Sequence, residues 1–511
     1  MYTHDLDLEN IVAALPTFTR TGKNTLQEKL KSPLADPLEI AKNQNEIQSI
    51  YQYVKKGGPK AREAIQATRA ILKGAEDHVV AIATVDSDAR YAEYYSQMLW
   101  SHDDRRFAWL NEIGWVLEII AFIKIFLVPG LSIIMPLILL LVPLLILSQE
   151  SDWSLTDYFD ILLKAIQKSM PTGMTPRFGT AGGLLKLGEQ FAHLSVAGVM
   201  FGVSIWTQVS AAISLHAVVE DMRQRAQSLR KFTAATKELA VLLGLAPIDS
   251  FDSLESYNDL KLFGVAWNDR TSVERLLAVA GRLDCLASLA LARKICFPTY
   301  DNEKGIQLEQ LYHPEVPVNR RVYNDVKMPQ SSSHILLTGP NRGGKSTLLK
   351  ALGTSVVMAH TVGIVFARKA NIPVFQNIVS AMEPRDHVGK LSLFESEIEF
   401  AKQVRELQGP TFLLMDEIFH GTNALDGVEA SCVFLDGIYK DSKDLFSVIS
   451  THYKELPERY KDQVQNLCME ASVDPKIPDR LKYSFRLRSG VNCLSSVREI
   501  LRERGLLCVS T

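Results

Sequence analysis

The sequence predicts an α/β domain of the P-loop type, preceded by an all-α region that contains one or two transmembrane helices. Three observations predict this fold class. Before Tyr300 most of the chain has the composition and spacing of long helices, whereas from residue 333 short apolar strands alternate with helices. A glycine-rich loop at residues 339–347 follows the first of these strands. Within the helical part, residues 125–147 contain no charged side chain.

Composition limits the classes of protein that this chain can form. Its 511 residues are enough for about three structural units. With 47% hydrophobic and 22% charged residues, the composition excludes collagen-like and wholly disordered chains. The net charge of -2 gives no overall basic field, so any contact with nucleic acid requires a local patch. Six scattered cysteines without a CxxC pair argue against a zinc site and a disulfide framework, and favour a reducing compartment.

Two long helices are predicted on either side of the apolar stretch. Residues 59–100 contain no proline after Pro59 and are rich in helix-forming residues, and residues 218–243 have the same character. A further helical region, residues 250–292, carries apolar residues at helical spacing, which predicts a core-facing stripe. The members of this stripe are Leu276, Leu277, Val279, Ala280 and Leu283.

The apolar stretch itself is long enough to cross a bilayer. About 20 apolar residues span a hydrocarbon core, and residues 125–147 meet that length. Prolines at 129, 136 and 143 are spaced seven apart, a feature that membrane helices tolerate better than soluble ones. A second uncharged segment, residues 194–215, has Gly198 and Gly202 in a GxxxG spacing that suits close helix packing. The alternative interpretation is a pair of buried core helices in a soluble protein.

Two crossings would place both flanking regions in one compartment. Basic residues just outside the segments agree with the positive-inside rule, which predicts a membrane protein whose C-terminal domain faces the cytoplasm. These residues are Arg105, Arg106, Arg223, Arg225, Arg230 and Lys231. Basic residues also occur between the segments, at Lys164, Lys168, Arg177 and Lys186. The charge pattern is therefore also compatible with the alternative, a soluble cytoplasmic protein.

The glycine-rich loop predicts a phosphate-binding site. The strand at residues 334–338 is followed by a complete GxxxxGKS loop and then by a helical sequence, the context that a P-loop requires. Backbone N–H groups of such a loop surround phosphate oxygens. We expect Lys345 to neutralise the β- and γ-phosphates and the Ser346 hydroxyl to bind Mg²⁺. The loop comprises Gly339, Pro340, Asn341, Arg342, Gly343, Gly344, Lys345, Ser346 and Thr347.

Two later strands deliver further candidate catalytic residues. The apolar strand that begins at Thr411 ends in Asp416 and Glu417. We expect Asp416 on the magnesium side and Glu417 as the general base that activates water. A third strand, residues 446–451, places His452 at its C-terminal end, where open α/β sheets bind their ligands. His452 is therefore predicted to contact the γ-phosphate or the attacking water.

These motifs resemble those of the MutS family of DNA mismatch-repair ATPases, whose nucleotide domain is of the ABC type. The loop TGPNRGGKST is similar to that family's TGPNxGGKST, and LLMDEIFHGTNALDG and STHYKEL resemble two further blocks of its ATPase domain. The HP pair at 313–314, the ND pair at 324–325 and the stretch GRLDCLASLALA also resemble family elements. Residues 22–48 look like the opening of the family's core domain. The similarity covers roughly residues 20–60 and 270–505.

The resemblance implies an ATP hydrolase that uses ATP and Mg²⁺ and works as a dimer with composite sites, so a homodimer is expected. Ser392 matches the family's signature serine, which reaches the partner's γ-phosphate; by itself it would be a helix N-cap. Asn341 would contact the nucleotide, and Asp426 would belong to a loop that communicates between the paired sites. The expected organisation is core helices and a first lever helix at 1–114, the apolar region at 115–217, returning helices at 218–300 and the ATPase domain at 301–511.

The sequence also departs from the family pattern. It begins at the core domain, which argues against direct mismatch recognition, and it stops before the family's terminal helix-turn-helix region. The apolar segments occupy the interval where repair members carry a DNA clamp on their lever helices. Arg342 and His420 replace the usual methionine and arginine, so altered turnover is expected.

The leading hypothesis is a membrane-anchored ATPase that moves lever helices. The main alternative is a soluble DNA-binding repair or recombination factor. A structural protein that binds ATP and hydrolyses it slowly is a third option.

Overall fold

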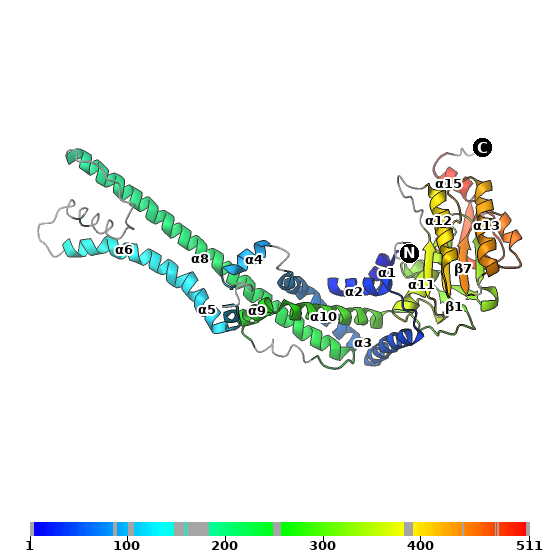
Figure 1. Cartoon of the computed structure of the whole chain (residues 1–511), viewed down its shortest axis with the longest axis horizontal. Coiled ribbons are helices and arrows are strands. Elements are labelled where there is room, and N and C mark those ends of the chain that lie inside the picture. The colour runs from blue at the N-terminus through cyan, green and yellow to red at the C-terminus, as the bar shows by residue number, and fades with distance from the viewer. Residues whose placement is uncertain are drawn as a thin grey trace. The chain divides into compact units, whose positions relative to one another are not determined.

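The computed structural model describes residues 5–84, 89–100, 107–147, 158, 161, 183–248, 257–382, 392–441, 444–475, 477 and 480–506 (Figure 1). The chain divides into two compact units. Unit 1 comprises Met1–Lys73, Thr236–Pro247 and Ala278–Thr511, and unit 2 comprises Gly74–Ala235 and Ile248–Leu277. Three helices continue from one unit into the other: α3 (Pro37–Ala83), α8 (Gly183–Leu242) and α10 (Arg270–Leu291).

The main sheet of unit 1 carries the predicted α/β pattern. It has six strands in the order β5-β6-β7-β3-β8-β9, all parallel except β9, which runs antiparallel to β8. The strands are β3 (His334–Thr338), β5 (Asn377–Ala381), β6 (Thr411–Met415), β7 (Leu445–Ser450), β8 (Gln465–Val473) and β9 (Leu481–Ser489). The three strands predicted from the sequence are confirmed as β3, β6 and β7, with β7 displaced by one residue.

Helices cover this sheet on both faces because its central strands are apolar on both sides. All residues of β3, β6 and β7 are buried, as expected for strands of a covered parallel sheet. Leu413 packs in a cluster with residues of α12 and α13, whereas its neighbour Leu414 approaches Gly353 of α11. The helices of this domain are α11 (Lys345–Thr361), α12 (Leu393–Glu406), α13 (Ala424–Asp441), α14 (Glu455–Arg459) and α15 (Val497–Glu503).

The nucleotide domain also contains a small antiparallel sheet, which the sequence did not predict. Its order is β2-β1-β4, with strands β1 (Ile306–Leu311), β2 (Asn324–Met328) and β4 (Lys369–Asn371). Pairing of β1 with β4 joins residues about 60 apart in the chain, so no local pattern indicates it. Short 3-10 turns, η5 (Val318–Arg320) and η6 (Gln330–Ser332), flank β2.

The helical part of unit 1 is organised around a buried ion pair. Arg69 on α3 and Asp284 on α10 are both fully buried, with 2.5 Å between Nε and Oδ1. The other carboxylate oxygen of Asp284 accepts hydrogen bonds from the backbone N–H and the hydroxyl of Thr19, the N-cap of α2 (Arg20–Lys31). One carboxylate thus joins α2, α3 and α10. The short helix α1 (Leu8–Ala14) precedes α2.

Unit 2 has a small aromatic core of its own. Tyr95 is fully buried, its ring lies 5.0 Å from that of Phe263 and 5.4 Å from that of Trp267, and its hydroxyl donates to Asp221. Gly264 lets helix α9 approach the backbone of Asn111 closely, because a Cβ there would lie 1.8 Å from that residue's carbonyl oxygen. The remaining elements are α4 (Ala89–Ser96), η2 (Ala108–Glu112), α5 (Gly114–Phe122), η3 (Ile123–Leu127), α6 (Val128–Leu147) and α9 (Asp259–Asn268).

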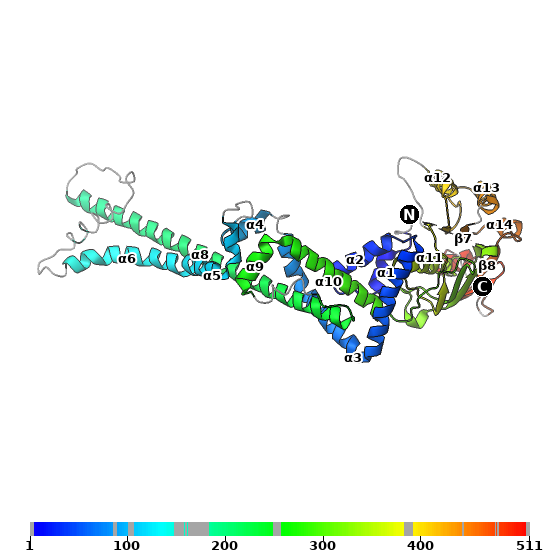
Figure 2. The same cartoon turned by 60° about the horizontal axis from the view of Figure 1, so that its bottom comes forward.

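Two helical stretches are long and apolar enough to cross a membrane by length and composition, Gly114–Met135 and Gly198–Leu242. They overlap the predicted segments at 125–147 and 194–215. In both views α5 and α6 follow each other along one rod, joined by the wider π-helical turns of η3 (Figures 1 and 2). Pro129 lies just after these turns and has no N–H to donate to residue 125, so the wider turn is the expected local adjustment.

The helices on either side of the apolar stretch are present. Residues 218–242 lie within α8, while the helix predicted at 59–100 ends at Ala83 and α4 begins at Ala89. Four residues of the expected stripe on α10 are buried, and Val279 is half-buried. Several basic residues named above lie outside the described residues, namely Arg105, Arg106, Lys164, Lys168 and Arg177. The side chain of Lys186 also lies outside them, as do residues 148–157 and 162–182 of the predicted 115–217 region. The four-part organisation stays a prediction.

Candidate functional site

The glycine-rich loop joins β3 to α11, as predicted. Gly339 has a φ of 145° and Gly344, the N-cap of α11, a φ of 94°, both in the region that favours glycine. A side chain at Gly339 would also crowd Met469 of β8, because its Cβ would lie 3.2 Å from that residue's Cβ. Arg342 has a φ of 67° without being glycine. These torsions turn the loop so that the N-terminus of α11 faces its concave side, as phosphate binding requires.

Lys345 is held inside the loop. Its Nζ lies 3.1 Å from the Gly339 carbonyl oxygen, 3.5 Å from Asn341 Oδ1 and 3.3 Å from His452 Nε2. Burial lowers the pKa of this lysine, and the nearby carboxylates of Glu417 and Asp416 oppose the shift. An anion that enters the loop therefore stabilises the charged form of Lys345.

Asp416 and Glu417 follow β6 directly, and β7 positions them. The Ser450 hydroxyl accepts a hydrogen bond from the Glu417 backbone N–H at 2.8 Å and donates to the Asp416 carboxylate. Asp416 N–H also donates to the Ala381 carbonyl at 2.9 Å, which ties this residue to the end of β5. Glu417 has a φ of 57°, so the chain turns sharply at this residue. The sequence did not indicate Ser450, although its place at the end of the strand beside β6 is a usable signal.

Glu417 and His452 are in direct contact. His452 Nε2 lies 2.8 Å from Glu417 Oε1 and 3.3 Å from Lys345 Nζ. One ring nitrogen cannot donate to a carboxylate and also accept from an ammonium group. The shorter contact, to an acceptor-only carboxylate, indicates that Nε2 carries the proton. This hydrogen bond is the main cause that lowers the pKa of Glu417, which is therefore ionised at neutral pH.

The oxygen donors near the loop fit a magnesium ion. Ser346 offers a hydroxyl at the start of α11 and Asp416 a carboxylate at the end of β6, and hard oxygen ligands are those that Mg²⁺ prefers. Among the described residues there is no group of three or more His, Cys, Asp or Glu side chains that could hold a metal ion alone. A metal at this site would complete its shell with phosphate oxygens and water, as is usual for Mg²⁺ bound with a nucleotide.

A cavity of about 430 Å³ opens beside the loop. Its walls include loop residues 340–347, Glu417 and, from outside the predicted motifs, Arg321, Val322 and Phe485. Asn324 of β2 fixes the place of Phe485, since its side-chain amide donates to the Phe485 carbonyl at 3.1 Å and accepts from Leu487 N–H at 2.8 Å. Phe485 has a φ of 57° next to an irregular β8–β9 register, so strand alternation in the sequence could not place it.

His313 forms another wall of this cavity. Burial lowers its pKa to about 4, so the ring is neutral at physiological pH, and its buried Nε2 has no hydrogen-bond partner among the described residues. The sequence singled out His313 and Asn324 only through the family resemblance.

Ser392 is the N-cap of α12, as its sequence context predicted. Its hydroxyl accepts from Glu395 N–H at 3.3 Å, and the Ser392 N–H in turn donates to the Glu395 carboxylate at 2.8 Å. Its expected contact with a partner's γ-phosphate stays a prediction. Asp426 lies in the first turn of α13, where Asn423 donates to its side chain.

The two residues that depart from the family pattern, Arg342 in the loop and His420 before Gly421, each have a partner. Arg342 pairs with Glu503 of α15 at 2.5 Å, and both side chains are partly exposed. His420 Nδ1 lies 2.9 Å from Glu397 Oε1 on α12.

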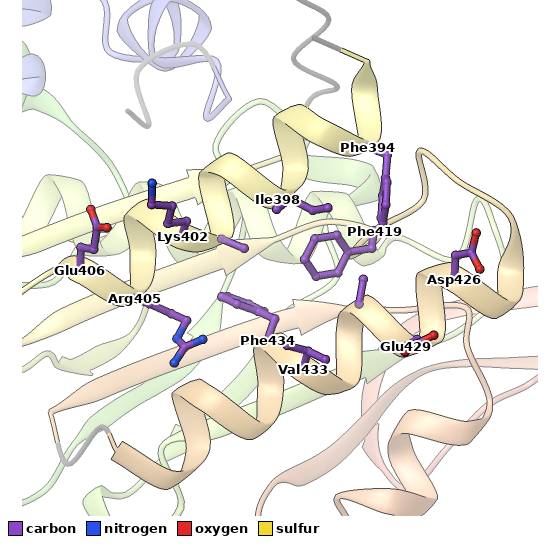
Figure 3. Close-up of a pocket in the computed structure, with 12 residues that line it drawn as sticks. Phe394, Ile398, Lys402, Arg405, Glu406, Phe419, Asp426, Glu429, Val433 and Phe434 are labelled. Carbon is purple, nitrogen blue, oxygen red and sulfur yellow. The ribbon is translucent and has the colours of Figure 1, made fainter.

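A larger cavity, of about 650 Å³, lies between α12 and α13 and includes no residue of the glycine-rich loop (Figure 3). Its floor is apolar and includes Phe419 and Phe434, with Lys402, Arg405 and Glu406 toward one end and Asp426 and Glu429 at the other. Size alone would favour this groove, yet it holds none of the residues with catalytic chemistry. The smaller cavity beside Lys345 is therefore the candidate active site.

Part of the chain is similar to known proteins. Residues 335–498 match the protein family described as MutS domain V. The chain is 28% identical over 234 residues to the human DNA mismatch repair protein Msh3, covering 41% of this chain and 20% of that protein. It is 30% identical to DNA mismatch repair protein MutS of Petrotoga mobilis (36% and 23% covered) and 29% identical to Endonuclease MutS2 of Latilactobacillus sakei (57% and 37% covered). The matched part thus spans between 20% and 37% of these relatives.

Proposed function

Because the chain belongs to the MutS family, whose members are ATPases, we propose that it binds and hydrolyses ATP in the cavity beside Lys345. The observation that carries the proposal is the meeting of Lys345, Glu417 and His452 within hydrogen-bond distance. They belong to the segments that follow three neighbouring parallel strands, β3, β6 and β7. A cation, an ionised carboxylate and an N–H donor at one point are the groups that phosphoryl transfer to water needs.

The geometry suggests a role for each side chain. Burial removes solvent from the ammonium group of Lys345, so this group binds the negatively charged β- and γ-phosphate oxygens. Glu417 orients the attacking water and takes its proton, while the water oxygen bonds to the γ-phosphorus and the bond to the β-phosphate oxygen breaks. The Nε2–H of His452 is held by Glu417 in the absence of nucleotide and donates to the γ-phosphate once that group is bound. The chemistry that Mg²⁺ supplies is neutralisation of phosphate charge, with Ser346 and Asp416 as its protein ligands.

A pair of lysine variants tests the nucleotide site. Lys345→Ala should abolish binding of ATP, measured by calorimetry, whereas Lys461→Ala, a matched change at an exposed lysine on the same domain, should leave it unchanged. Binding of ATP by Lys345→Ala with native affinity would contradict the proposal.

The active form proposed here is a dimer with shared sites, in which Ser392 reaches the partner's nucleotide. Members of the family act as dimers. Ser392→Ala should therefore bind ATP but lose turnover. Mixing Ser392→Ala with Lys345→Ala protein should restore turnover, because each mixed dimer then contains one site with both residues intact. Failure of the mixture to recover activity, with mixed dimers demonstrated, would show that the sites are not shared.

We further propose that α5, α6 and the apolar part of α8 anchor the protein in a membrane. A core helix of a soluble protein buries its apolar side chains, but only 17% and 6% of the most apolar windows of the two candidate spans are buried. Trp115 is 66% exposed and Trp206 is 73% exposed. Other exposed side chains include Phe122, Phe126, Leu131, Ile134, Val199 and Ile213. Apolar surface on this scale marks a membrane or protein contact.

Alkaline washing of membranes tests the anchor. The full chain should stay with the membrane, and a variant that lacks residues 125–147 should appear in the supernatant with its ATP binding intact. Release of the full chain by the wash would overturn the membrane proposal.

The second candidate function is DNA binding by a soluble protein, and the names of the relatives favour it, since two are DNA mismatch repair proteins and one is an endonuclease. If the full chain is soluble, binding to duplex DNA should weaken steeply with salt, as phosphate contacts require. A soluble chain that shows no salt-dependent DNA binding would exclude this candidate.

A further inference from the structure

We infer that residues 5–7 position the P-loop helix α11 and transmit nucleotide occupancy to helices α2, α3 and α10 of unit 1. The inference rests on the proposed ATP site and names a control element for it. These residues precede every sequence motif, yet each of the three contacts a different part of the nucleotide domain. All the contacts used below lie within unit 1.

Leu6 fills a gap in α11. It is fully buried, and a Cβ at Gly353 would lie 2.7 Å from its Cδ2 and 2.5 Å from Leu414 Cδ1. Only glycine at position 353 leaves room for both leucines, so Leu6 is inserted where α11 passes β6. These two elements begin with Lys345 and lead into Asp416, respectively. A shift of α11 against β6 must therefore move Leu6.

Asp5 and Asp7, the neighbours of Leu6 in the chain, hold Leu6 in this position. The buried Asp5 carboxylate accepts a hydrogen bond of 2.7 Å from the Ser380 hydroxyl at the end of β5, one residue before the carbonyl that holds Asp416 N–H. Asp7 pairs with Lys350. Lys350 lies five residues after Lys345 on α11, roughly 7.5 Å along the helix axis. The segment therefore contacts α11 five residues after Lys345, and β5 next to the residue whose carbonyl holds Asp416 N–H.

A continuous set of contacts leads from this segment into the helices. After α1, the carbonyl of Pro16 accepts from the guanidinium of Arg69 and, at 3.0 Å, from the Ser288 hydroxyl. Thr19 follows: its backbone N–H and its hydroxyl donate to Asp284, and the hydroxyl oxygen accepts from Gly22 N–H and so caps α2. Arg69 and Asp284 are buried and paired, so water cannot replace their contacts when residues 16–19 move. A displacement of residues 16–19 therefore displaces α3 and α10 as well.

The other end of α11 is held by the same helical region. Its last carbonyls, those of His360 and Thr361, accept hydrogen bonds from the backbone N–H of Leu34 and the side chain of Asn43. Helix α11 is therefore held at its middle by residues 5–7, and at its end by the α2–α3 connection and the first turns of α3. A rigid helix held at two points converts a displacement at its N-terminus into a displacement of both contacts.

Hydrogen exchange of the full chain tests this coupling. In the wild type, addition of a non-hydrolysable ATP analogue should raise protection in residues 16–31 and 278–291. In Leu6→Ala most of that rise should disappear and kcat should fall about tenfold, as expected for a misplaced catalytic group, while affinity for the analogue changes less than about threefold. Glu9→Gln, an exposed change on α1, is the matched control and should behave as the wild type.

Two further variants separate positioning from loss of folding. Gly353→Ala adds a side chain in the gap and should reproduce the Leu6→Ala result without altering the N-terminal segment. Asp7→Lys should reduce the response, and Asp7→Lys combined with Lys350→Asp should restore it, which a defect of general stability would not do.

A wild-type nucleotide response in both Leu6→Ala and Gly353→Ala would overturn the inference and leave the proposed function intact. If the wild-type chain fails to bind the analogue, both are wrong.

Discussion

The phosphate site and the apolar helices differ in how firmly their side chains are held. At the strand ends, Lys345, Asp416 and Glu417 each have several protein partners, and the central strands behind them are completely buried. Along α5, η3 and α6 many large side chains, such as Phe126 and Leu131, are exposed to whatever surrounds the helix. Chemistry is therefore fixed by internal contacts in the first region, whereas the second region depends on its environment.

This difference indicates what mutation should do in each place. In the phosphate site a single change removes a specific interaction and should affect turnover. In the apolar helices a single change alters only the free energy of transferring the helix from water to a membrane. It should therefore affect the location of the protein and leave ATP turnover intact. The following predictions separate the two regions, from the largest expected effect to the smallest.

Glu417→Gln should have the largest effect. Loss of a general base lowers kcat by about 100-fold to 10,000-fold, while binding of ATP is retained because the amide keeps the shape of the carboxylate. Single-turnover kinetics and calorimetry measure the two quantities. Glu429→Gln on α13 is a control outside the phosphate site. Native turnover by Glu417→Gln would remove this residue from the role of base.

Charges introduced on α6 should act only on location. Leu131→Arg and Ile134→Arg should each disfavour the membrane by about 2.5–3.5 kcal/mol, so the double variant should leave alkaline-washed membranes. Its affinity for ATP should stay within about twofold of the native value. Leu425→Arg, at an 84% exposed position of the nucleotide domain, should not change membrane retention. Equal retention of all these proteins would mean that α6 is outside the bilayer.

Acid should destabilise the nucleotide domain through three buried histidines. Burial lowers the pKa of His313, His334 and His360 to about 4, so the folded form binds fewer protons than the unfolded form between pH 4 and 6.5. Their contribution is complete above pH 6.5 and is lost as the pH falls. Each should cost at most about 2 kcal/mol between pH 6.5 and 5.

Helices α5 and α6 contain no histidine, so acid should spare them through this mechanism. Urea unfolding followed by hydrogen exchange at pH 7 and pH 5 measures the effect in each region. A free energy of unfolding of the nucleotide domain that does not change over this range would contradict the assignment.

Asn324→Ala should give the smallest effect. It removes two hydrogen bonds to the backbone of β9 and so loosens Phe485 at the rim of the cavity, at a cost of about 1 kcal/mol. KM for ATP should rise several-fold with little change in kcat. Gln307→Ala on the neighbouring strand β1 is the control. A fall in kcat without a change in KM would place Asn324 in the chemistry instead of in nucleotide positioning.

The sequence by itself determined the parts of the site that depend on neighbouring residues. Strand, loop and helix around Lys345 form a local unit whose torsions are dictated by its glycines, and the carboxylates at the end of β6 follow an apolar run of five residues. Ser392 as a helix cap and the length of the apolar segments are equally local. In each case the cause is backbone geometry or helix length acting within about twenty residues.

Only the tertiary structure decided which distant side chains meet at these motifs. Ser450 joins the two carboxylates because β7 pairs in register with β6, and Asn324 positions Phe485 across more than 150 residues of chain. Leu6 reaches Gly353 only because the N-terminal segment packs on α11. Such contacts depend on sheet register and on space left between packed elements. Register and packing space are set only when the whole domain folds around its core, and no local sequence pattern encodes them.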